Sequence, residues 1–106
     1  MTYKVFDSEG LFGYTQITTF YMDFGIAERF GKNAILDTYK RGLDYAKTDY
    51  KVLTEFVMVL NWKVWEHYQD NEPLAELYND LWMKADEYAM SHLTGEALDY
   101  FYRTTD

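Results

Sequence analysis

Helix-breaking residues are scarce along most of this sequence. Pro73 is the single proline among 106 residues, and only Gly42 and Gly95 follow Gly31 among the glycines. Proline lacks a backbone N–H and glycine has high backbone freedom, so both disfavour helix interiors. Their scarcity leaves long stretches that favour helices joined by short turns. The sequence therefore predicts an all-α protein, a compact bundle of four to five helices.

The length fits a single helical domain, residues 1–106, with its own hydrophobic core. Residues 1–17 mix apolar side chains with Gly10, Gly13 and Ser8, which predicts a short non-helical N-terminal arm. The chain contains no cysteine, which excludes disulfides, thiolate metal sites and a cysteine nucleophile. No signal peptide is apparent, and the most apolar stretch, residues 56–65, is too short to span a membrane. We expect a cytoplasmic protein without membrane attachment.

Apolar residues recur at helical spacing in five segments. The predicted helices cover residues 18–30, 33–47, 49–69, 73–93 and 95–102. Asp49 is a suitable N-cap for the third, and Pro73 suits the first position of the fourth. The inner face of the first helix is predicted to contain Phe20, Phe24 and Ala27, widened by Ile26 and Phe30.

The third predicted helix is apolar nearly all round. One stripe is formed by Leu53, Phe56, Val57, Leu60 and Val64, whereas the polar strip is limited to Lys51, Glu55, Glu66 and Gln69. Met58, Trp62 and Trp65 project from other sides of the helix. Such a helix is either buried at the centre of the bundle or covered by a partner. Met58, Trp62 and Trp65 are therefore candidate interface residues, and both interpretations stay open here.

The formal net charge of −8 is distributed unevenly. Residues 1–65 contain eight acids and eight bases, whereas residues 66–106 contain ten acids and two bases. Glu76, Asp80 and Glu87 are predicted on the outer face of the fourth helix and complete the candidate protein interface. Eleven tyrosines and three tryptophans add side chains that give large contact area at low entropy cost. These features favour binding to a protein partner, or to a second copy of the chain.

No catalytic or cofactor motif is present in the sequence. His67 and His92 fall on predicted core faces of different helices, and neither belongs to a His-Glu-x-x-His or Glu-x-x-His pattern. A Gly-rich phosphate loop and a Gly-x-Ser-x-Gly elbow are also absent. We therefore predict a protein that is not an enzyme and has no catalytic residues, metal ligands or cofactor.

Residues 26–41 resemble a helix-turn-helix corner, in which Ala27 is followed four residues later by Gly31. Lys32, Lys40 and Arg41 would then contact nucleic acid. However, the motif expects apolar residues at the positions of Lys32 and Asp37, and a net charge of −8 opposes binding to a polyanion. A nucleic-acid-linked regulator is accordingly the alternative to protein binding.

Five segments resemble small uncharacterised proteins encoded in phages, prophages and other mobile elements of Gram-positive gut bacteria. The segments are YMDFGIAERFG, AILDTYKRG, YKVLTEFVMVLNWKVWEHY, LYNDLWMKADEYA and GEALDYFYRTTD, within residues 20–106. The resemblance implies an accessory protein that acts by binding, with a host or defence protein as its partner. It implies no activity and no functional residues.

Overall fold

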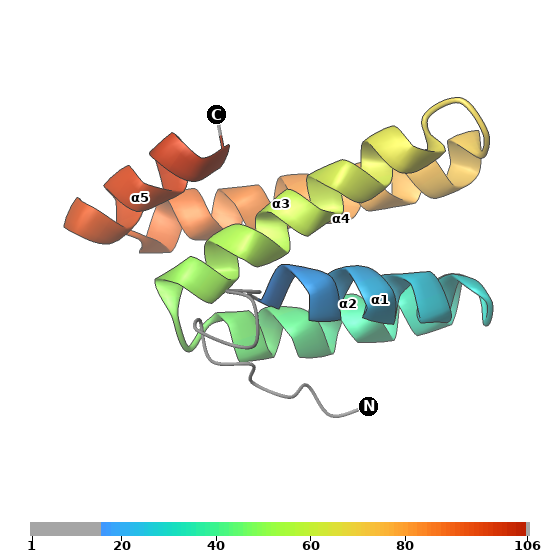
Figure 1. Cartoon of the computed structure of the whole chain (residues 1–106), viewed down its shortest axis with the longest axis horizontal. Helices are drawn as coiled ribbons and strands as arrows, with labels where there is room; N and C mark the ends of the chain where they lie inside the picture. The colour runs from blue at the N-terminus through green and yellow to red at the C-terminus, as the bar shows by residue number, and fades with distance from the viewer. Residues whose placement is uncertain (1–15, 106) are drawn as a thin grey trace.

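The computed structural model describes residues 16–105. In that range the chain forms five helices: α1 (Gln16–Glu28), α2 (Lys32–Ala46), α3 (Tyr50–His67), α4 (Glu72–His92) and α5 (Gly95–Thr105). Figure 1 shows α1 and α2 folded back on each other, with α3 and α4 forming a second hairpin beside them. The prediction of an all-α bundle is thus confirmed. None of the helices in this range has both the length and the apolarity needed to cross a membrane.

The predicted helix boundaries differ from the observed ones mainly at the two ends of the chain. Gln16 and Ile17 belong to α1, although the predicted arm extended to residue 17. The rest of that arm, residues 1–15, lies outside the described residues. At the other end, α5 continues past the predicted residue 102 to Thr105.

Side-chain caps explain where α3 and α4 begin. The Asp49 carboxylate accepts a hydrogen bond from the backbone N–H of Lys51 at 2.8 Å, as predicted for an N-cap residue. Asn71 accepts one from the N–H of Leu74 at 3.2 Å, and Pro73 lies in the first turn of α4. The turn between α3 and α4 therefore consists only of residues 68–71, and it holds the two helices side by side.

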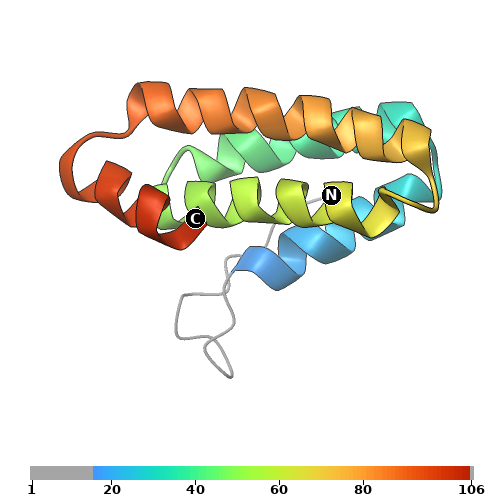
Figure 2. The same ribbon diagram turned by 90° about the horizontal axis from the view of Figure 1, so that it is seen from above.

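Helix α3 is the centre of the bundle, because it packs against each of the other four helices (Figures 1 and 2). The core contains a cluster of aromatic rings to which three helices contribute. Phe20 of α1 meets Phe56 of α3 edge to face with centroids 4.9 Å apart, and Phe24 meets Tyr78 of α4 in the same manner at 5.6 Å. Edge-to-face pairs of this kind contribute roughly 0.5–1.5 kcal/mol beyond the burial of their area.

Four side chains do not lie where the periodicity predicts them. Ile26 and Phe30 are exposed, Phe30 to 77%, because Ile26 lies a third of a turn from the buried stripe and α1 ends before Phe30. Glu55 is buried rather than exposed, since other helices cover α3 on more than one side. His92 is exposed rather than in the core, and its ring stacks on that of Tyr88 at 4.0 Å.

We expect Phe56→Ala to destabilise the bundle by roughly 3–5 kcal/mol, because it removes a buried ring that contacts α1 and α2 and leaves a cavity. Urea unfolding followed by circular dichroism measures this change. Phe30→Ala is the matched control and should change stability by less than about 0.5 kcal/mol. Equal losses in the two variants would contradict the assignment of Phe56 to the core.

Candidate functional site

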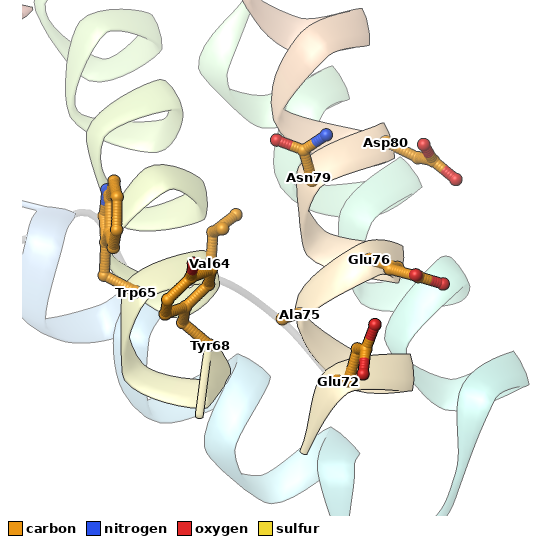
Figure 3. A pocket seen from close by; sticks show the side chains of 8 residues that line it. All are labelled: Val64, Trp65, Tyr68, Glu72, Ala75, Glu76, Asn79 and Asp80. Atoms are coloured by element: carbon orange, nitrogen blue, oxygen red, sulfur yellow. The ribbon is translucent and has the colours of Figure 1, made fainter. Parts of the chain in front are cut away.

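A groove of about 790 Å³ lies between α3 and α4, at the end where their connecting turn lies. We call it the α3–α4 groove. Figure 3 shows aromatic and apolar side chains of α3 on one side and carboxylates along the far rim on α4. Its lining residues are Val64, Trp65, Tyr68, Glu72, Ala75, Glu76, Asn79 and Asp80.

The aromatic wall of the groove is largely open to solvent. Trp65 is 65% exposed and Tyr68 is 60% exposed, and their ring centroids lie 5.5 Å apart. Val64 and the buried Ala75 form apolar surface between these rings and α4. Two large aromatic side chains held side by side in this way leave apolar area uncovered, which is typical of a binding surface.

The opposite wall is a row of carboxylates. Glu72, Glu76 and Asp80 follow one another at intervals of four residues, so they lie on one face of α4. None of them forms an ion pair with a cation of residues 16–105. Like charges at this spacing destabilise a helix by roughly 0.2–0.5 kcal/mol per pair. A cation placed in the groove would relieve that repulsion.

The structure divides the candidate interface residues of the sequence among three places. Trp65, Glu76 and Asp80 meet in the α3–α4 groove. Met58 and Trp62 line a different hollow, on the side of α3 that faces α5. Glu87 is exposed on α4 and lines neither. Trp62 and Trp65 are both exposed to at least 45%, so α3 is central and yet presents tryptophan at the surface.

The residues of the predicted helix-turn-helix corner do not form a basic surface. Lys32 and Lys40 are exposed, but Arg41 pairs with Asp37 at 2.8 Å. Asp44 lies in the next turn of α2 and approaches Lys47 at 3.8 Å. Acids therefore alternate with the bases along α2, which weakens the positive potential that a phosphate backbone requires.

A second polar site, which was not predicted, lies around a buried lysine between α1, α3 and α4. Lys63 of α3 is only 2% exposed, and its ammonium donates hydrogen bonds to Glu28 of α1 at 2.8 Å and to Glu66 at 2.7 Å. Tyr78 of α4 donates to Glu28 at 2.5 Å, and Tyr21 of α1 donates to Glu66. We call this group, together with His67, the Lys63 cluster.

Ionisation within the Lys63 cluster is governed by its ion pairs. Burial lowers the pKa of Lys63, but its hydrogen bonds to Glu28 and Glu66 raise the pKa by a larger amount, and the net pKa lies above the ordinary value. Burial and the neighbouring Glu28 raise the pKa of Tyr78 far above its ordinary value. Lys63 is therefore an ammonium ion and Tyr78 a neutral donor, and neither is an activated nucleophile.

The same cluster contains three groups that could bind a metal. Oxygen or nitrogen atoms of Glu28, Glu66 and His67 lie within 4.8 Å of one another, and the His67 Nε2 atom is 3.3 Å from Glu28 and 3.1 Å from Glu66. A metal would have to displace the Lys63 ammonium, which already binds both carboxylates. We interpret the cluster as an internal clamp between α1, α3 and α4.

The Lys63 cluster could not be predicted from the spacing of acids and histidines within single helices, because Glu28 and Lys63 come from different helices. One local signal was present, since Lys63 interrupts an apolar stretch and has Glu66 three residues ahead of it. Glu28 could not be added from the sequence, because its position depends on how α1 packs against α3.

Comparison with known proteins supplies no relative: no protein family matches the chain, no curated protein matches its sequence and no solved structure matches its fold.

Replacing Lys63 with methionine should lower the free energy of unfolding by about 3 kcal/mol, because the substitution leaves the partly buried carboxylate of Glu28 without its cation. Chemical denaturation measures the loss. Arg103→Met serves as the control, since the pair between Arg103 and Asp99 is exposed and should contribute less than about 1 kcal/mol. If the two variants lose the same stability, the clamp interpretation is wrong.

Ionisation of Glu66 should make the free energy of unfolding depend on pH in the acidic range. Burial raises its pKa, but hydrogen bonds from Lys63 and Tyr21 lower it more, so the folded-state pKa lies below the ordinary 4.5. Its contribution is therefore complete above pH 4.5 and is lost as the pH falls through the folded-state pKa. We expect the stability difference between the parent and Glu66→Gln to shrink as the pH falls below 4.5. A difference that grows toward acid pH would contradict this assignment.

Proposed function

We propose that this protein is a non-enzymatic accessory protein that binds a protein partner through the α3–α4 groove. The observation that supports this proposal is the pairing of an exposed aromatic wall with a row of carboxylates that have no cation partner within residues 16–105. The resemblance to mobile-element proteins suggests that the partner is a host or defence protein.

The chemistry of the groove specifies the kind of partner surface. A basic segment would place its cations against Glu72, Glu76 and Asp80, where they form charge-assisted hydrogen bonds. The stems of its lysine or arginine side chains, or an arginine plane, would pack against Trp65 and Tyr68. We therefore infer that the partner presents a basic segment rather than an acidic or purely apolar one.

The nucleic-acid alternative has less support. It would use Lys32, Lys40 and Arg41, and the acids of α2 lie among these bases. The ten acids of residues 66–106 would also repel a phosphate backbone. It remains a distinct outcome of the experiment below.

The groove can be tested with defined peptides by fluorescence anisotropy. We expect an arginine-rich peptide to bind the parent and a glutamate-rich peptide of equal length not to bind. The double variant Glu76→Gln, Asp80→Asn and the single variant Trp65→Ala should each weaken binding about tenfold, or about 1.4 kcal/mol. Glu87→Gln with Glu96→Gln is the charge control, and Phe30→Ala is the control for loss of an exposed aromatic side chain.

The same variants then serve in a capture experiment from host lysate, with and without nuclease. A protein retained by the parent and by both controls but lost with the groove variants would support the proposal. Groove and control variants that bind alike would contradict it. Partners that disappear with nuclease, and with Lys40→Ala plus Arg41→Ala, would favour the nucleic-acid alternative instead.

A further inference from the structure

A second hollow, of about 410 Å³, lies where α5 packs across α3 and α4. We call it the α5 hollow. Figure 2 shows α5 turning back from the end of α4 to run alongside α3. The hollow is separate from the α3–α4 groove, because the two share no lining residue. Its volume is within the range of sites that bind small molecules, roughly 300–1,000 Å³.

A carboxylate without a cation partner among residues 16–105 lies in the α5 hollow. Asp86 of α4 is half-buried there, and no cation of residues 16–105 pairs with it. Arg103, the base of α5, is engaged with Asp99 at 3.0 Å on the exposed side of that helix. Burial raises the pKa of Asp86, and no neighbouring cation lowers it. Burying this group therefore costs stability that the described part of the chain does not offset.

The side chains around Asp86 suit a cation rather than an anion. Four aromatic residues and two methionines line the hollow: Trp62, Trp82, Phe101, Tyr102, Met58 and Met90. Aromatic faces are negatively polarised and attract an ammonium group, most strongly in the case of tryptophan. Methionine adds polarizable apolar surface that adapts to different ligand shapes. Asn61, which also lines the hollow, has an amide oxygen that could accept a second hydrogen bond from the same ammonium group.

We propose that the α5 hollow binds a small organic ammonium compound, with its charge on Asp86 and its apolar or aromatic body against Trp62 and Trp82. The proposal is independent of the basic segment inferred for the α3–α4 groove. The ligand of this proposal binds between α3, α4 and α5. Binding of a peptide segment at the same place is a different outcome, which the experiment distinguishes.

Three probes that share one phenyl body test the proposal: protonated phenethylamine, the neutral phenethyl alcohol and the anionic phenylacetate. The Trp65→Phe variant keeps Trp62 and Trp82, the two tryptophans that line the hollow, so its fluorescence reports on this site. We expect the ammonium probe to bind about tenfold more tightly than the alcohol and the carboxylate not to bind.

The variants Asp86→Asn and Asp80→Asn each remove one negative charge from α4, but only Asp86 lines the hollow. In the Trp65→Phe background, Asp86→Asn should abolish the preference for ammonium over alcohol, whereas Asp80→Asn should retain it. Equal effects of the two variants would show attraction by net charge only and would overturn the proposal. Equal affinity for the ammonium probe and the alcohol probe would also overturn the proposal. So would a result in which none of the three probes binds while the arginine-rich peptide quenches the fluorescence of Trp62 and Trp82.

Backbone amide shifts of the unsubstituted chain give a measurement that does not depend on any variant. Phenethylamine should perturb amides of α5 and of α3 near Trp62, and it should leave those near Tyr68 and Glu72 unchanged. Perturbation confined to the α3–α4 groove would overturn the proposal, and it would leave the proposed function of that groove intact.

Discussion

The position of α1 depends on the buried ammonium group of Lys63, which binds one carboxylate of α1 and one of its own helix. An unpaired ammonium group at this depth would cost several kcal/mol, so Lys63 is stable in the interior only when the partly buried Glu28 and Glu66 pair with it. Tyr78 extends the cluster to α4 by its hydrogen bond to Glu28. The register of α1 that satisfies these polar groups also places Phe20 and Phe24 on the aromatic core.

Several basic side chains form ion pairs with nearby acids, and they are therefore not available to pair with the carboxylates of α4. Lys63 is engaged inside, Arg41 and Lys47 approach acids of their own helix, and Arg103 pairs with Asp99. The carboxylates of α4 that face the two hollows are left without cations from residues 16–105. Four of the ten acids of residues 66–106 line these two hollows, three in the α3–α4 groove and Asp86 in the α5 hollow. Each hollow also has tryptophan in its lining, and this combination is the basis of the two proposals that each binds a positively charged group.

Much of the fold could be predicted from the sequence, because it depends on local pattern. The spacing of Phe20, Phe24 and Ala27 predicts the buried face of α1, and the N-cap at Asp49 and Pro73 in the first turn predict where α3 and α4 begin. Of the candidate site, Glu76 and Asp80 were predicted on the outer face of their helix, whereas Trp65 was a candidate interface residue whose burial the pattern left open. The meeting of these three residues in one groove was not predicted, since it requires the short turn that holds α3 beside α4.

The sequence by itself determined the helices, their approximate ends and the excess of acid in the last part of the chain, because these depend on residues near one another. Only the tertiary structure decided that Glu28 meets Lys63, that Trp62 and Trp65 face different hollows and that Asp86 lies in the α5 hollow without a cation partner from residues 16–105. These facts depend on which helices pack together and at what register. That outcome is set by burial and polar satisfaction summed over the whole bundle, and no single segment contains it.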